Sequence, residues 1–183
     1  MSTKARANIE DLYNLPGKAE IVNEEIVLMS PTGGDPGYAA DEVFVSLREY
    51  SRRTKMGRAV GDNKEFHVNL PNRGSFSPDA AFYVGPNPGM KFYEGAPIFA
   101  VEVRSETDYG SAADKGIAAK RLDYFAAGTL VVWDVDLLGT DVIRAYIESD
   151  PTNPKIFRRG DIADCEPALP GWRFDVDNLF ETA

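Results

Sequence analysis

Residues 99–105 read FAVEVRS, an apolar run that is interrupted by the carboxylate of Glu102. The run predicts a buried strand over residues 97–104, in which successive side chains point to opposite faces of a sheet. Because burying an unpaired carboxylate costs roughly several kcal/mol, Glu102 needs a cation, hydrogen-bond donors or solvent. A solvated strand end or a salt bridge to Arg104 would satisfy it, and so would a functional site.

A second short apolar strand, residues 79–84 (DAAFYV), opens with Asp79 directly after Pro78. If this strand lies beside the first, Asp79 and Glu102 converge at one edge or end of the sheet. Two carboxylates placed together repel each other unless a divalent cation lies between them. The alternative is that Asp79 only caps a turn.

The helix predicted over residues 108–127 carries Lys120 four residues before Tyr124, so both side chains lie on one face. For an isolated pair, a surface lysine beside a core tyrosine is the simpler interpretation. Together, however, Asp79, Glu102 and Lys120 around a metal form a coherent phosphodiester-cleaving site. The metal would activate water, the lysine would offset charge on the phosphate, and the Val103 carbonyl would complete the ligand set.

The rest of the chain predicts a mixed sheet with helices packed on it, an α+β (α/β) fold. A helix is expected over residues 38–55, and strands within 19–30, 58–70, 130–135, 142–147 and at 156–157. Loops or turns are expected at 31–37, 71–78, 85–97 and 151–154, and the tail predicts a short strand and a helical turn. The order in the middle of the chain is helix, three strands, helix, strand.

The composition of the chain limits the kinds of metal site and binding surface that it can form. A length of 183 residues predicts one domain, and single copies of cysteine (Cys165) and histidine (His67) exclude an internal disulfide and a zinc site of the usual kind. Any metal would need carboxylate and carbonyl ligands, as magnesium, manganese or calcium does. The net charge of −9 argues against a general phosphate-binding surface.

One local basic run lies at the end of the first long helix. Its candidate nucleic-acid contacts are Arg52, Arg53, Lys55 and Arg58, although a solvated helix end would explain them as well. No apolar run approaches the roughly 20 residues of a membrane span, and residues 1–15 lack the apolar core of a signal peptide. We therefore expect a cytoplasmic protein that does not bind membranes.

Three segments, SPDAAFYV (77–84), FAVEVRSETD (99–108) and KRLDYFAAGTLVVWDVD (120–136), resemble the Uma-two family of the PD-(D/E)XK, or restriction-endonuclease-like, superfamily. AEIVNEEIVLMSPTGG (19–34) resembles its N-terminal pattern. The resemblance implies a helix–strand–strand–strand–helix–strand core, extra terminal strands, a magnesium- or manganese-dependent endonuclease and DNA as substrate. It implies Asp79 and Glu102 as metal ligands. The superfamily lysine usually stands two residues after the second acid, where this chain has Arg104, and Lys120 matches the family's displaced lysine.

Further site candidates follow from the same comparison: Glu20 matches the family's early glutamate, and Tyr124, Ser105 and Arg104 adjoin the motif residues. Lys115 competes with Lys120 but lacks a tyrosine four residues later. Glu106 departs from the family, which commonly has proline there, and indicates a specialised member.

The expected organisation is one domain over residues 1–183, with a core at about 19–136 and a strand extension at 137–183. Exposed terminal strands and the superfamily's pairing of active sites favour a homodimer. Two other functions stay open: a non-catalytic protein that binds nucleic acid or another partner, and a metal-dependent hydrolase of a small phosphodiester. The charge of −9 gives weight to both.

Overall fold

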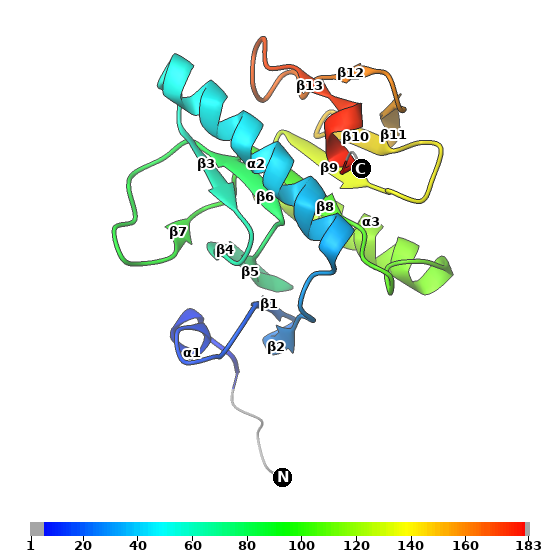
Figure 1. The fold of residues 1–183 in the computed structure, drawn as a ribbon. Helices are drawn as coiled ribbons and strands as arrows, with labels where there is room; N and C mark the ends of the chain where they lie inside the picture. The colour runs from blue at the N-terminus through cyan, green and yellow to red at the C-terminus, as the bar shows by residue number, and fades with distance from the viewer. Residues whose placement is uncertain (1–5, 182–183) are drawn as a thin grey trace.

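A computed structural model describes residues 6–181 and arranges them in two main sheets, a two-stranded sheet and helices (Figure 1). The helices are α1 (Ile9–Leu12), α2 (Gly34–Thr54), α3 (Ser111–Ala126) and the 3-10 turn η1 (Val176–Leu179). The strands are β1 (Ala19–Val22), β2 (Glu25–Leu28), β3 (Arg58–Gly61), β4 (Phe66–Leu70), β5 (Arg73–Phe76), β6 (Ala80–Tyr83), β7 (Tyr93–Glu94), β8 (Phe99–Val103), β9 (Val131–Val135), β10 (Ile143–Ile147), β11 (Asp150–Phe157), β12 (Ile162–Ala163) and β13 (Phe174–Asp175). Among the described residues no helix is both long and apolar enough to cross a membrane.

The larger sheet has the strand order β11-β10-β9-β8-β6-β3 and is mixed, since β8 and β9 are parallel and its other pairs are antiparallel. Parallel neighbours need a crossover connection, and α3 provides it between β8 and β9. Helix α2 runs across one face of this sheet (Figure 1). The chain order α2-β3-β6-β8-α3-β9 therefore reproduces the predicted core, and the α+β prediction is confirmed.

Strand β8 lies inside this sheet because both of its faces are apolar. Phe99, Val101 and Val103 belong to the core cluster that packs against α2. Ala100 points the other way and joins the cluster that contains Tyr124 of α3. This alternation also directs Glu102 toward α3, where the cleft described below opens.

The second sheet has the order β2-β1-β5-β4-β7, and residues 77–79 connect its strand β5 to β6 of the larger sheet. The predicted loop over residues 71–78 is wrong, because Arg73–Phe76 forms β5. Proline and glycine in the sequence mask this strand. Gly74 packs closely against the neighbouring strand, where a Cβ would lie 3.0 Å from the Ile21 side chain and would require it to shift.

Three other boundaries differ from the predictions. Helix α2 begins at Gly34, inside the predicted loop 31–37, and β7 lies inside the predicted loop 85–97. The predicted turn at 151–154 is part of β11. Prolines 151 and 154 are tolerated there because β11 is an edge strand, where a missing N–H breaks no ladder in the sheet interior. The predicted strand and helical turn of the tail correspond to β13 and η1.

The C-terminal segment completes the core on the α2 side of the sheet. Trp133 of β9 and Trp172 lie with their ring centroids 5.3 Å apart, and both are buried. Phe99 and Phe174 pack against the same pair of rings. Residues from the middle of the chain and from its C-terminal part thus share one aromatic cluster.

Candidate active site

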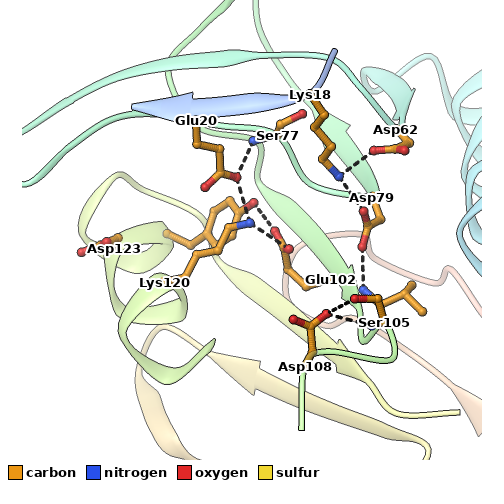
Figure 2. A network of polar contacts seen from close by, with 12 residues as sticks. Lys18, Glu20, Asp62, Ser77, Asp79, Glu102, Ser105, Asp108, Lys120 and Asp123 are labelled. Atoms are coloured by element: carbon orange, nitrogen blue, oxygen red, sulfur yellow. Dashed lines mark hydrogen bonds and ion pairs between the residues drawn. The ribbon is translucent and has the colours of Figure 1, made fainter. Parts of the chain in front are cut away.

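A cleft of about 410 Å³ opens where the two main sheets approach α3. Its lining includes Lys18, Asp79, Glu102 and Lys120, together with residues 27–32 on the side of the smaller sheet. Figure 2 shows these charged side chains converging: Lys18 and Asp79 directly precede β1 and β6, Glu102 lies in β8, and Lys120 lies in α3. The structure therefore brings together the three residues predicted to carry the chemistry.

Asp79 is held by backbone and side-chain contacts. Its N–H donates to the carbonyl of Val101 (3.1 Å), and β6 pairs with β8, which meets the condition under which Asp79 and Glu102 converge. Its Oδ2 accepts a hydrogen bond from the Val103 N–H (2.8 Å), and its Oδ1 pairs with Lys18 Nζ (2.7 Å). Lys18 also contacts Asp62 Oδ1 at 2.6 Å (Figure 2).

Glu102 receives two donors from one face of α3. Lys120 Nζ lies 2.8 Å from its Oε2, and the hydroxyl of Tyr124 lies 2.6 Å from its Oε1. Burial raises the pKa of Glu102; Lys120 opposes this shift, and the negative charges of Asp79 and Glu20 add to it. Because α3 places residues 120 and 124 one turn apart, a single helix face neutralises and orients this carboxylate.

Glu20 reaches the same place from β1. Its Oε1 pairs with Lys120 Nζ (2.8 Å) and accepts from the Ser77 N–H (2.9 Å), while its Oε2 pairs with Arg73 (2.8 Å). Burial raises the pKa of Glu20, but Lys120 and Arg73 outweigh it, so the pKa is lowered overall. Lys120 is consequently a bridge between Glu20 and Glu102, and these two carboxylates raise its pKa although burial opposes them.

Sequence reasoning missed Lys18, Asp62 and Arg73. Lys18 stands two residues before Glu20, so strand alternation could have placed both on one face. Arg73 was hidden by the wrong loop prediction, and Asp62 by a turn in the sequence GDN. Arg73 continues the network through its Nε to Asp123 Oδ2 (2.8 Å).

Two of the further candidates turn away from the carboxylates. Arg104 forms paired contacts of 2.8 Å with both oxygens of Asp134 and another with Asp114. Ser105 donates to Asp108 through its N–H (2.8 Å) and its Oγ (2.6 Å). Both line the cleft, but within residues 6–181 neither forms a hydrogen bond or ion pair with Asp79 or Glu102.

The structure does not bring the basic run to the cleft. Arg52 and Arg53 lie in the last turn of α2, and Lys55 caps it. Thr32 lines the cleft just before the other end of this helix. A helix of 21 residues spans about 30 Å, so the basic run lies at the far end. Strand β3 ends at Gly61, which pairs with Ala80 of β6, the residue after Asp79. Arg58 begins β3 and therefore lies at the end of this strand that is away from Asp79.

Behind Glu20, Glu65 lines a smaller cavity of about 240 Å³. Its side chain is buried, and Oε2 has no hydrogen-bond partner in the described part of the chain. Burial and the charge of Glu20 raise the pKa of Glu65 to about 9. Both effects favour the neutral, protonated form of the Glu65 carboxyl group.

The donor atoms of the cleft decide which metal it can hold. Within residues 6–181 no three Asp, Glu, His or Cys side chains are grouped to hold an ion. Asp79 and Glu102 nevertheless present carboxylate oxygens close enough for Asp79 to raise the pKa of Glu102. In an extended strand the N–H and C=O of one residue face the same neighbour, so the Val103 carbonyl is on the Asp79 side. This all-oxygen set fits a hard divalent cation.

Comparison with known proteins agrees with the fold. A crystal structure described as "a putative nuclease belonging to DUF820 from Anabaena variabilis ATCC 29413" has a TM-score of 0.73 and 14% sequence identity, covering 95% of this chain and 97% of that chain. A search of curated proteins finds no match. The model of the Uma2 family, described as "Putative restriction endonuclease", matches residues 9–177, which include every cleft residue named above. The family that the sequence motifs predicted is thereby confirmed, and the chain belongs to the Uma2 family.

Proposed function

We propose that the protein is a divalent-metal-dependent endonuclease that hydrolyses DNA phosphodiester bonds. One observation carries the proposal: Asp79 before β6, Glu102 in β8 and Lys120 in α3 line one cleft, with Lys120 Nζ 2.8 Å from Glu102. Membership of a family described as restriction endonucleases supports a nucleic acid as substrate.

In this proposal Asp79 and Glu102 hold magnesium or manganese, with the Val103 carbonyl as a third oxygen. When bound, the metal supplies a water of lowered pKa and a counter-charge for the phosphate. Lys120 places a second positive charge beside the same phosphate, where a fixed cation stabilises charge that develops in the transition state. Tyr124 fixes the orientation of Glu102, and Glu20 fixes that of Lys120.

A second candidate is hydrolysis of a small phosphodiester. The placement of the basic run favours it, because Arg52 and Arg53 lie at the far end of α2 from the cleft. The net charge of −9 also disfavours a long contact with duplex DNA. Comparing supercoiled plasmid with bis(p-nitrophenyl) phosphate as substrates would separate the two candidates.

The decisive test is plasmid nicking in Mg²⁺ or Mn²⁺ by the wild-type chain and by Asp79→Asn and Glu102→Gln. We expect nicking that EDTA abolishes and that either substitution lowers by about 100-fold or more, the range for loss of a group that stabilises the transition state. Glu106→Gln is the matched control, because Glu106 is exposed and follows the motif closely in sequence. Nicking that persists equally in both variants would refute the assignment.

A further inference from the structure

The ammonium group of Lys18 lies between two carboxylates at the edge of the cleft. Its Nζ is 2.6 Å from Asp62 Oδ1 and 2.7 Å from Asp79 Oδ1. The side chains of Lys18 and Asp79 are 10% and 11% exposed, whereas that of Asp62 is 36% exposed. Lys18 therefore connects a partly exposed surface carboxylate to a buried one in the cleft (Figure 2).

Every oxygen of the two carboxylates proposed as metal ligands, Asp79 and Glu102, already has a hydrogen-bond or ion-pair partner. Asp79 accepts from the Val103 N–H and pairs with Lys18, and Glu102 has Lys120 and Tyr124. A divalent cation at Asp79 would stand within a few ångströms of the Lys18 ammonium, and like charges at that range in a partly buried site repel strongly. Binding of the divalent ion thus requires the ammonium group of one of the two lysines, Lys18 or Lys120, to move.

Lys18 is the resident cation that can move at low cost. Lys120 is enclosed by Glu20, Glu102 and the ring of Tyr124, and Glu20 is itself anchored by Arg73 and the Ser77 N–H. Lys18, in contrast, has its second partner in Asp62, which directly follows β3 and is partly exposed to solvent. It can release Asp79 while it keeps an ion pair.

We propose that Lys18 is the resident counter-ion of Asp79 and that a divalent cation binds by exchange with it. The ion takes the oxygen of Asp79, and the ammonium withdraws to Asp62. Lys18 then sets how tightly the cleft holds its metal, and it keeps the carboxylates paired when no metal is bound. This inference rests on the proposed metal-dependent function.

The first test is a Mn²⁺ titration by calorimetry on the full chain, comparing the wild type with Lys18→Met. Removing the competing charge should tighten Mn²⁺ binding by roughly tenfold or more, the factor that one charge at this range exerts on proton binding. Lys64→Met is the matched control: Lys64 also reaches Asp62, through its carbonyl at 2.9 Å, but it does not contact Asp79. Its affinity should stay within about twofold of wild type. If Lys18→Met bound Mn²⁺ no more tightly than the wild type, the proposed exchange would be wrong.

The second test uses the wild-type chain and so does not depend on how a variant folds. Acetic anhydride modification of Lys18, followed by peptide mass spectrometry, should accelerate several-fold when Mn²⁺ is added, because the ammonium moves away from the buried Asp79 toward the more exposed Asp62. Lys64 should show no change. An unchanged Lys18 rate at saturating Mn²⁺ overturns the inference but leaves metal-dependent cleavage intact. Absence of any Mn²⁺ binding to wild type or variant would overturn both.

Discussion

The hydroxyl of Tyr124 donates a hydrogen bond of 2.6 Å to Oε1 of Glu102. Its ring is fully buried and stacks on Phe76, with centroids 3.9 Å apart. Helix α3 and strand β8 are thereby connected at the carboxylate on which the proposed chemistry depends. The hydrogen bond fixes one oxygen of Glu102 independently of Lys120.

Replacing Tyr124 by Phe keeps the stacked ring and removes only the donor. We expect the free energy of unfolding to fall by about 1–3 kcal/mol, because a buried charged acceptor loses its partner. Urea denaturation followed by circular dichroism measures it. Tyr146→Phe is the control, since the Tyr146 hydroxyl makes no hydrogen bond within residues 6–181. Equal losses in the two variants would contradict the prediction.

Lys120→Met should lower plasmid nicking by about 100-fold or more, because it removes the cation proposed to face the phosphate. It also leaves Glu20 and Glu102 without their shared partner, so the variant's fold should be checked by circular dichroism. Lys115→Met provides the matched control on the same helix, since Lys115 is exposed. A comparable loss in Lys115→Met would show that the assignment of the lysine is wrong.

Glu65 should make stability depend on pH. Burial raises the pKa of Glu65 from its ordinary value of 4.5 to about 9, so the folded chain binds a proton that the unfolded chain releases. The stabilisation is complete below pH 4.5 and is lost as the pH rises through 9, with a slope of up to about 1.4 kcal/mol per pH unit.

Glu65→Gln removes this titration. The difference in unfolding free energy between wild type and variant should therefore change with pH across that window, in favour of the variant at higher pH. Urea unfolding at pH 5, 7 and 9 measures the difference. A constant difference at all three values would mean that Glu65 is ionised in the fold.

The placement of the cations predicts which arginine contacts nucleic acid. A groove of about 400 Å³ beside the cleft is lined by Arg104, Arg121 and Arg144. Arg121 stacks on Tyr146, 3.5 Å from the ring centroid, and forms no ion pair in the described part of the chain.

Arg121→Gln should therefore weaken DNA binding and reduce the dependence of log affinity on log salt by about one. Filter binding in EDTA, which prevents cleavage, measures both. Arg53→Gln should have little effect, because Arg53 lies at the far end of α2. If Arg53→Gln weakened DNA binding more than Arg121→Gln, the basic run of residues 52–58 would be the nucleic-acid contact.

Much of the core was predictable because its signals are local. The apolar runs of β6, β8 and β9 and the spacing of Lys120 and Tyr124 depend on neighbours in sequence, and the structure places these elements together. Pro78 before Asp79 correctly indicated the start of a strand. That these residues bind metal and cleave phosphodiesters stays a prediction.

What sequence reasoning missed is non-local. Arg73 is part of the network only because β5 pairs with β1, and its neighbours Asn72 and Gly74 are typical of a loop. Lys18 acquires its role from Asp62 and Asp79, which are 44 and 61 residues away. Pro151 and Pro154 favour a turn when only the sequence is considered. They are compatible with β11 because this strand lies at the edge of its sheet. In each case the deciding contact is tertiary, and local propensity gives way to it.

The aromatic cluster on the α2 side of the sheet has a practical consequence for spectroscopy. Trp133 and Trp172 are the chain's two tryptophans, and both lie in this cluster. Trp133 and Val101 are paired in register and belong to the same core cluster, so the indole lies on the opposite face from Glu102. Intrinsic emission therefore reports whether the C-terminal segment is docked on β9, and ions that enter the cleft should leave its wavelength unchanged.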